Sequence, residues 1–249
     1  MKIAVWQTHP RHDVDQALSD LDAAVRDADA ELFVTPEMYM GGYNVGADRV
    51  TELAAMAVDV GAIAKASGTT IVCGMATSGD TPYNSAVVFG PDGQEVTRYH
   101  KAHLFGDLDR RQFAAGPAMP PVFKLGDWTV GLAICYDIEF PETARHLAAL
   151  GAELIVVPTA NMIPFDSVPL RLVPARAEEN EIVVAYANYI GVEGPLTYGG
   201  LSCICGPDGD DIARAARDET ILIAQLDRAA LNDRRAQIHH TADRRTDLY

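Results

Sequence analysis

The sequence of 249 residues predicts an α/β fold built as one domain. Short apolar runs suited to buried strands alternate with segments whose apolar residues recur at helical spacing, and no linker divides the chain. A strand-turn-strand unit also recurs, because Ser-Cys-Ile-Cys-Gly-Pro-Asp-Gly at 202–209 echoes Ser-Ala-Val-Val-Phe-Gly-Pro-Asp-Gly at 85–93. This echo favours two halves with similar plans and two related sheets, with about ten strands in all.

The first half is expected to open with a βαβ unit. Leu18, Leu21 and Val25 recur at helical spacing, and Asp13 and Asp15 favour the start of that helix through its dipole. The expected elements are a strand at 2–7, a helix at 14–28, a strand at 32–35, a helix at 49–67, a strand at 70–76 and a hairpin at 84–99.

The second half continues the alternation. A buried strand is expected to end at Cys135, and Pro141 suits the first turn of the next helix. Pro174 should kink the following helix or delay its start. The expected elements are a helix at 141–150, a strand at 153–157, a helix at 169–180, a strand at 182–189, a glycine-rich loop at 191–200, the second hairpin and a strand at 220–226, followed by a charged tail at 228–249 that forms a solvated helix or a partner-binding arm.

Charge and composition exclude some classes of partner. The formal net charge of -15 argues against nucleic acid and against an anionic membrane surface, since both require clustered cations. The N-terminal residues lack the apolar region of a signal peptide, and no run is long enough to span a membrane, so a cytoplasmic protein is expected. The four cysteines should be reduced thiols, and Cys203-x-Cys205 has no second pair at metal-binding spacing.

Three residues follow directly after expected strands: Glu37, Lys101 and Cys135. Ligands of open α/β sheets gather at the carboxyl ends of strands. Cys135 alone is better interpreted as a small buried apolar residue, which is the usual environment of a free cysteine. Together, however, a carboxylate, a lysine and a thiol provide the base, the oxyanion partner and the nucleophile that thiolate-mediated amide cleavage requires.

Short motifs occur in a defined order over roughly residues 2 to 228. They are Pro36-Glu37, Tyr99-His100-Lys101-Ala102-His103-Leu104-Phe105, Ile134-Cys135-Tyr136-Asp137 with Phe140-Pro141-Glu142, Arg176-Ala177-Glu178-Glu179-Asn180 and Gly199-Gly200-Leu201-Ser202. In this order they resemble the nitrilase superfamily of carbon-nitrogen hydrolases, on its amidase-like branch. The resemblance implies a four-layer αββα sandwich of two mixed β-sheets, a Glu-Lys-Cys triad without cofactor or metal, and self-association as a homodimer or a larger homo-oligomer.

The resemblance also assigns roles to residues. Glu37 would take the proton of Cys135, and Lys101 with the backbone N–H of Tyr136 would stabilise the tetrahedral oxyanion. The family carries a second glutamate a few positions after the lysine, where this sequence has Asp107 and Asp109. Asp109 matches better by spacing, although its side chain is one methylene shorter.

Supporting residues and one rival mechanism come from the same motifs. Arg176 and Glu179 resemble a structural ion pair, and Asp137 is expected to hold the turn after the nucleophile. His103 acting as the base for Cys135 would give a papain-like dyad. That alternative lacks the local cysteine-protease signature.

The residues after Cys135 bear on the substrate. The Cys-Tyr-Asp sequence is similar to the amidase side of the superfamily, so a small amide and water are the expected reactants; nitrile or N-carbamoyl hydrolysis is the alternative. Glu139 should disfavour anionic substrates by an effect of about 1 kcal/mol. Candidate residues of the acyl pocket are Tyr43, Asn161, Met162 and Phe165. A catalytically silent relative that serves as a binding or scaffold protein is the alternative from another class.

Overall fold

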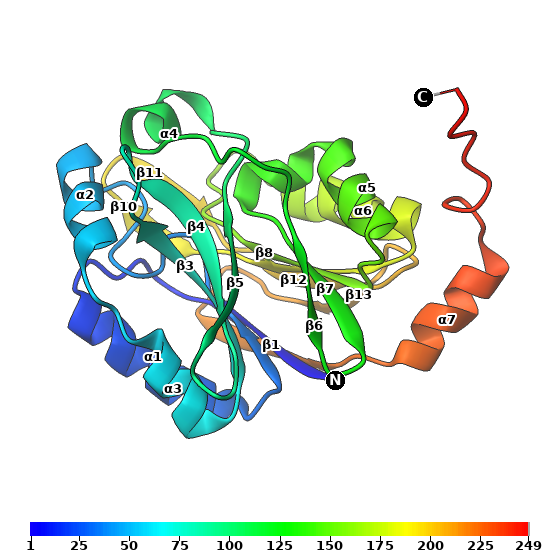
Figure 1. The fold of residues 1–249 in the computed structure, drawn as a ribbon, viewed down its shortest axis with the longest axis horizontal. Coiled ribbons are helices and arrows are strands. Elements are labelled where there is room, and N and C mark those ends of the chain that lie inside the picture. The colour runs from blue at the N-terminus through cyan, green and yellow to red at the C-terminus, as the bar shows by residue number, and fades with distance from the viewer. Residues whose placement is uncertain (249) are drawn as a thin grey trace.

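The computed structural model describes residues 1–248 as two six-stranded sheets packed between helices (Figure 1). The first sheet has the strand order β14-β1-β2-β3-β4-β5, with β1, β2 and β3 parallel and the other neighbours antiparallel. Its strands are β1 (Lys2–Gln7), β2 (Leu32–Val34), β3 (Thr70–Thr77), β4 (Tyr83–Phe89), β5 (Glu95–His100) and β14 (Thr220–Gln225).

The second sheet repeats this plan with the order β13-β12-β9-β8-β7-β6, and β7, β8 and β9 are its parallel centre. Its strands are β6 (Val122–Leu125), β7 (Trp128–Leu132), β8 (Leu154–Pro158), β9 (Val183–Ala187), β12 (Cys203–Cys205) and β13 (Asp211–Arg214). The two sheets that the internal echo predicted are therefore present.

Helices lie on the outer faces of both sheets. Figure 1 places α1 and α3 beside the first sheet and α5 and α6 beside the second. The helices are α1 (Val14–Ala28), α2 (Ala47–Ala55), α3 (Val60–Ser67), α4 (Gly106–Gln112), α5 (Pro141–Ala149), α6 (Val173–Asn180) and α7 (Arg228–Gln237), with a 3₁₀ turn at Cys135–Glu139 and a π turn at Val168–Leu172.

Alternation along the strands produces the layers. Val5 of β1 and Val34 of β2 pack with Val130 of β7 in a core between the sheets. Ala4 and Phe33, their neighbours in the chain, point the other way and pack against the first helical layer. A third cluster buries β8 and β9 against α5 and α6. Because successive strand residues face opposite sides, two buried faces per sheet require four layers, and the αββα sandwich is confirmed.

Several expected boundaries are wrong. The helix expected at 49–67 is split into α2 and α3, because Met56 adopts an extended conformation and Asp59 caps the new helix by accepting a hydrogen bond from the Ala62 N–H. The loop expected at 191–200 is a hairpin of β10 (Ile190–Glu193) and β11 (Leu196–Gly199). Short strands such as these raise the number of strands above the expected ten or so.

The helix expected at 169–180 begins instead as the π turn, and α6 starts at Val173. Pro174 therefore occupies the first turn of α6, where its missing N–H breaks no helical hydrogen bond. This is the delayed start that its position predicted.

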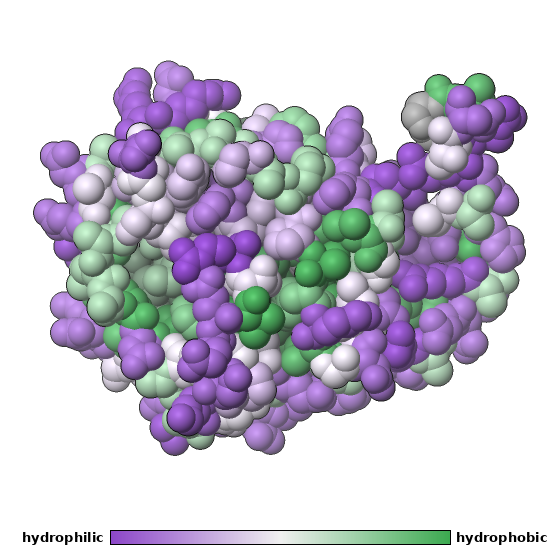
Figure 2. All heavy atoms as spheres, viewed as in Figure 1, coloured by the Kyte–Doolittle hydropathy of each residue, from purple (hydrophilic) through white to green (hydrophobic). Residues whose placement is uncertain are grey.

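The C-terminal segment leaves the sandwich. In Figure 1, α7 and the residues after it extend away from the second sheet, and Figure 2 shows that this projection is largely hydrophilic. Leu231 is the buried residue of α7, and Arg235 donates a hydrogen bond to the Glu181 carbonyl at 3.0 Å. In residues 1–248, no helix combines the length and apolar character needed to cross a membrane.

Candidate active site

Glu37, Lys101 and Cys135 meet at one end of the two sheets. Glu37 follows β2, Lys101 follows β5, and Cys135 opens the 3₁₀ turn after β7. Both Glu37 and Lys101 are fully buried, and Cys135 is 9% exposed. The fold thus brings together three side chains that are separated by up to about a hundred residues in the chain, as expected for carboxyl ends of strands at a common edge.

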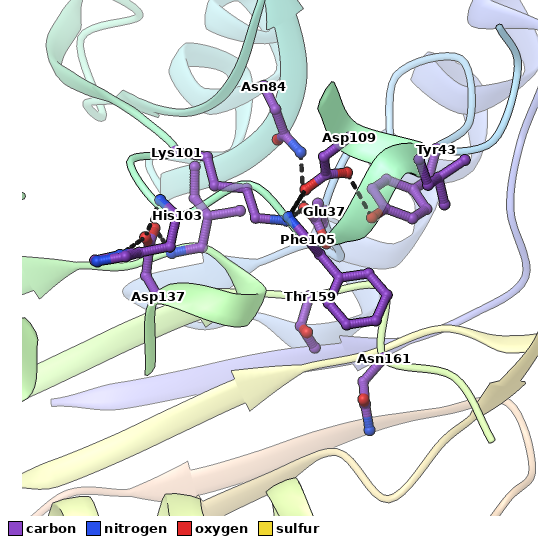
Figure 3. Close-up of polar contacts among 12 residues, drawn as sticks. Glu37, Tyr43, Asn84, Lys101, His103, Phe105, Asp109, Asp137, Thr159 and Asn161 are labelled. Atoms are coloured by element: carbon purple, nitrogen blue, oxygen red, sulfur yellow. Dashed lines mark hydrogen bonds and ion pairs between the residues drawn. The ribbon is translucent and has the colours of Figure 1, made fainter. Parts of the chain in front are cut away.

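The Lys101 ammonium lies between two carboxylates. Its Nζ atom is 2.7 Å from Glu37 Oε1 and 2.7 Å from Asp109 Oδ2 (Figure 3). Burial by itself lowers the pKa of Lys101, but attraction from Asp109 and Glu37 outweighs it and raises that pKa well above its usual value. Lys101 is therefore a fixed cation, suited to stabilising an oxyanion and unsuited to acting as a base.

The two oxygens of Glu37 have different surroundings. Oε1 accepts hydrogen bonds from Lys101 and from Asn84 Nδ2, which is 2.7 Å away. Oε2 is buried, and among the described residues it has no partner at conventional hydrogen-bond geometry. Burial raises the pKa of Glu37, Lys101 opposes that shift, and the Cys135 side chain lowers the pKa slightly through a hydrogen bond. Oε2 is thus the oxygen available for proton transfer.

Asn84 was missed from the sequence. It is fully buried near the start of β4, and Figure 3 shows its amide directed at Glu37. An amide side chain at the start of a mostly apolar strand was the signal that could have revealed it, because buried amides require a partner.

Cys135 has an unusual backbone. Its φ of 46° lies in the left-handed region, which non-glycine residues avoid and which recurs at functional sites. Burial and the nearby Glu37 carboxylate raise the pKa of its thiol, while Lys101 and hydrogen bonds with Thr159 and the backbone of Ala160 lower it. The raised pKa favours the protonated thiol, so a nearby base would assist its ionisation.

Asp137 holds the turn that carries Cys135. Its Oδ2 atom accepts hydrogen bonds from the Ile134 N–H at 3.2 Å and the Tyr99 hydroxyl at 3.0 Å. Its Oδ1 atom lies 2.9 Å from the His103 backbone N and 2.7 Å from His103 Nδ1. The hydrogen bond with Asp137 raises the pKa of His103, and the imidazole stacks on Phe140. His103 is therefore tied to the turn, and these contacts do not support the papain-like dyad.

Arg176 supports the same turn from α6. Its Nε and Nη2 atoms donate to the carbonyls of Ile138 and Glu139 at 3.1 and 2.7 Å, and Nη1 lies 3.2 Å from Glu179 Oε1. The expected ion pair is present, but most of the guanidinium's hydrogen bonds hold the backbone after Cys135. Glu139 itself is partly buried, which raises the pKa of its carboxyl.

The structure distinguishes the two candidate aspartates. Asp109 on α4 is fully buried, whereas the side chain of Asp107 is 80% exposed and lies 3.7 Å from Arg111. Besides Lys101, Asp109 accepts hydrogen bonds from the Phe105 N–H at 2.8 Å and the Tyr43 hydroxyl at 2.6 Å. The shorter side chain reaches the lysine directly because α4 lies close to it.

The candidate pocket residues differ in exposure, since three are buried and one is exposed. Tyr43 is fully buried with its hydroxyl on Asp109, Asn161 donates to the Phe165 carbonyl at 3.1 Å, and Met162 packs in the first core cluster. Phe165 is 40% exposed and meets Phe105 edge to face, with ring centroids 5.7 Å apart. Contact of these residues with substrate remains a prediction.

A second aromatic contact lies beside Cys135. The rings of Phe105 and Tyr136 meet edge to face at 5.3 Å, and Tyr136 meets Phe140 in the same way at 4.9 Å. Aromatic side chains therefore continue from the turn after Cys135 to Phe105, which Figure 3 shows in front of Thr159. Such a wall suits the apolar part of a small ligand.

A family comparison agrees with this geometry. The family model described as "Carbon-nitrogen hydrolase" matches residues 2–236. The chain belongs to the carbon-nitrogen hydrolase family. Its match covers both sheets, the strand ends that carry Glu37, Lys101 and Cys135, and nearly all of α7.

Two proteins from other organisms have sequences similar to this chain. A protein named "Hydrolase in pqqF 5'region" from Pseudomonas protegens is 46% identical, over 100% of this chain and 90% of its own length. A 2-oxoglutaramate amidase from Paenarthrobacter nicotinovorans is 32% identical, over 93% of this chain and 83% of its own length.

A solved amidase structure has the same fold. It is a mutant of the amidase from Nesterenkonia sp. AN1 with the acetamide moiety of fluoroacetamide covalently added at the active site cysteine. Its TM-score against this chain is 0.86 at 31% identity, covering 100% of this chain and 95% of that one. This amidase is assigned to the nitrilase superfamily, as the sequence motifs of the present chain had indicated.

Proposed function

We propose that this carbon-nitrogen hydrolase is an amidase that converts a small carboxamide into a carboxylate and ammonia. The proposal rests mainly on one observation: the buried Lys101 cation bridges Glu37 and Asp109 beside the Cys135 thiol. That arrangement supplies a nucleophile, a base and a fixed positive charge in a site largely closed to water.

The first half of the reaction forms a thioester. Glu37 Oε2 takes the Cys135 proton while the sulfur attacks the amide carbonyl, and the developing oxyanion is stabilised by Lys101 and the backbone N–H of Tyr136. Collapse of the tetrahedral intermediate breaks the carbon–nitrogen bond, and Glu37 returns the proton to the departing ammonia. Because Lys101 remains charged throughout, Glu37 carries out every proton transfer.

The second half releases the acid. Glu37 removes a proton from a water molecule that attacks the thioester, and the second tetrahedral intermediate expels the Cys135 sulfur. The proton held by Glu37 passes to the sulfur, which restores the thiol. At the end of the cycle, Glu37, Lys101 and Cys135 have the same protonation states as before substrate and water entered.

We further infer a preference for neutral or amine-bearing amides over anionic ones. Glu139 follows Cys135 in the same 3₁₀ turn, and Arg176 holds its carbonyl. The formal charge of -15 on the whole chain adds a long-range field that repels anions. An amine-bearing substrate would be attracted by the same field.

Ammonia release from a panel of amides tests this function. The panel compares aliphatic amides, an amino-acid amide and 2-oxoglutaramate, with Cys135→Ala as the paired control. We expect turnover of the first two classes and loss of activity in the variant. Equal inertness of both proteins on all substrates would favour a binding or scaffold role, and clear preference for 2-oxoglutaramate would contradict the charge argument.

A further inference from the structure

Glu193 is a buried carboxylate next to the active-site loops. It ends β10, is 3% exposed, and extends from the small hairpin towards the loop after β2. Its Oε1 atom accepts the Tyr43 N–H at 3.1 Å, and its Oε2 atom accepts the Asn44 N–H at 2.8 Å and the Tyr198 hydroxyl. Both carboxylate oxygens are therefore used to fix one loop to the hairpin.

The loop is shaped to receive this carboxylate. Gly42 has φ of 98°, and a Cβ atom there would lie 2.6 Å from Glu193 Oε1. A larger residue would displace the carboxylate from the Tyr43 N–H. The close approach of Glu193 thus depends on glycine at this position.

Tyr43 is held from its other side as well. Gln112 Nε2 donates to the Tyr43 carbonyl at 3.3 Å, and Gln112 Oε1 accepts the Gly46 N–H at 2.8 Å. Gln112 belongs to α4, which also carries Asp109. The peptide groups on both sides of Tyr43 are consequently fixed, so that the direction of its ring is determined by the backbone.

The Tyr43 hydroxyl completes a connection to the active site. It donates to Asp109 Oδ1 at 2.6 Å, while Asp109 Oδ2 lies 2.7 Å from Lys101 Nζ. The lysine also lies over the Tyr43 ring, 5.7 Å from its centroid. A shift of the Tyr43 backbone would therefore move both a hydrogen bond to Asp109 and a ring beside the cation.

We infer that Glu193 is a positioning residue for the amidase reaction, which acts through Tyr43 and Asp109 to hold Lys101 where the oxyanion forms. This inference rests on the proposed amidase function. Among the described residues, Glu193 itself forms no hydrogen bond with Lys101 or Cys135; its hydrogen-bond donors are Tyr43, Asn44 and Tyr198. Its effect should therefore depend on the Tyr43 hydroxyl.

A double-mutant cycle tests this dependence. Glu193→Gln, Tyr43→Phe and the double variant are compared with wild type for kcat, KM and melting temperature on a neutral amide. We expect each single change to lower kcat by about 10-fold with KM changed less than about 2-fold, and the double variant to be no slower than Tyr43→Phe alone. The inference would be overturned if the fold-losses in kcat of the two single variants multiplied in the double variant. It would also be overturned if Glu193→Gln had the kcat of wild type.

Two further variants separate positioning from folding. His12 is an exposed neighbour of Glu193, with Nδ1 3.7 Å from Oε1, and His12→Gln should leave kcat unchanged. Tyr198→Phe keeps the Glu193 carboxylate and removes one hydrogen-bond donor to it. This variant replaces Glu193→Gln in the test if Glu193→Gln does not fold. We expect it to lower kcat by about 3-fold, and only when the Tyr43 hydroxyl is present; an effect that persists in Tyr43→Phe would count against the inference.

Alkylation of Cys135 by iodoacetamide provides a readout that does not require amidase activity. In the proposed site, Glu37 accepts the thiol proton and Lys101 stabilises the thiolate, which displaces iodide. The other cysteines are fully buried, and peptide mass mapping identifies the modified one. If Glu193→Gln slows alkylation relative to wild type, but the double variant is alkylated as fast as Tyr43→Phe, the positioning role of Glu193 is supported even if no amide is hydrolysed. Equal alkylation rates in wild type and Glu193→Gln would contradict that role.

Discussion

The Lys101 ammonium lies 2.7 Å from Asp109 Oδ2, and both side chains are fully buried. Glu37 shares the same ammonium, so two carboxylates surround one cation. Burial and the nearby Asp109 carboxylate raise the pKa of Glu37, while Lys101 opposes that shift. The shared lysine therefore connects the proposed oxyanion partner with the proposed base.

Asp109→Asn should weaken this connection. Removal of the charge leaves the buried lysine with one carboxylate partner, and we expect kcat to fall by about 100-fold and the free energy of unfolding to drop by about 3 kcal/mol. Steady-state kinetics and urea denaturation measure both effects. The matched control is Asp107→Asn, which changes an exposed side chain on the same helix and should behave as wild type. If Asp107→Asn lowered kcat and stability more than Asp109→Asn, Asp107 rather than Asp109 would be the acidic partner of Lys101.

The pH dependence of kcat/KM should report the raised pKa of Glu37. Glu37 acts as a base only when it is deprotonated, so activity is expected to be lost as pH falls through the raised pKa. The acid limb should thus lie above the ordinary range of a glutamate. Initial rates between about pH 3 and pH 10 measure it. An acid limb at or below the usual glutamate pKa would contradict this environment for the base.

Asn84→Ala should move that acid limb further. Asn84 donates to the charged form of Glu37, so loss of its amide raises the pKa of the base and shifts the limb to higher pH. We expect kcat/KM at neutral pH to fall by roughly 10- to 100-fold. Ser85→Ala is the matched control, because its hydroxyl lies against His100 and Thr77 rather than Glu37. An unshifted limb in Asn84→Ala would exclude this role.

Arg176→Lys should loosen the turn that carries Cys135. A lysine cannot donate simultaneously to the carbonyls of Ile138 and Glu139, so we expect a loss of stability of about 1 to 3 kcal/mol and a lower kcat. Glu179→Gln removes only the partly exposed ion pair and should cost about 0.5 kcal/mol. Thermal unfolding of both variants compares the two contributions. If Glu179→Gln proved the more damaging change, the ion pair would be the main function of Arg176.

The sequence predicted alternating strands and helices because buried strands produce apolar runs, such as those before Glu37 and Cys135. The four-layer arrangement and the roles of Glu37, Lys101 and Cys135 were implied by the family resemblance, since strand spacing alone does not encode them. The boundaries of α1 were also clear, because Asp13 caps its start and accepts the Gln16 N–H at 2.9 Å.

Other features lacked a local signal. The break between α2 and α3 was hidden because Leu53, Ala57 and Val60 continue the helical spacing of apolar residues through it. α4 was missed because it is short and mostly polar. Gly191 and Gly194 made the β10–β11 hairpin resemble an irregular loop, which concealed Glu193. Asn84 and Glu193 gain their significance only from long-range contacts, and residue spacing does not encode these contacts.

The central claim is that Cys135 carries the acyl group between amide cleavage and hydrolysis. The most direct measurement is mass spectrometry of protein quenched in acid during turnover of a small amide, followed by peptide mapping. We expect a mass increase equal to the acyl group on the peptide that contains Cys135, and none in Cys135→Ala. Ammonia release that continues in Cys135→Ala, or an acyl group found on another residue, would contradict the mechanism.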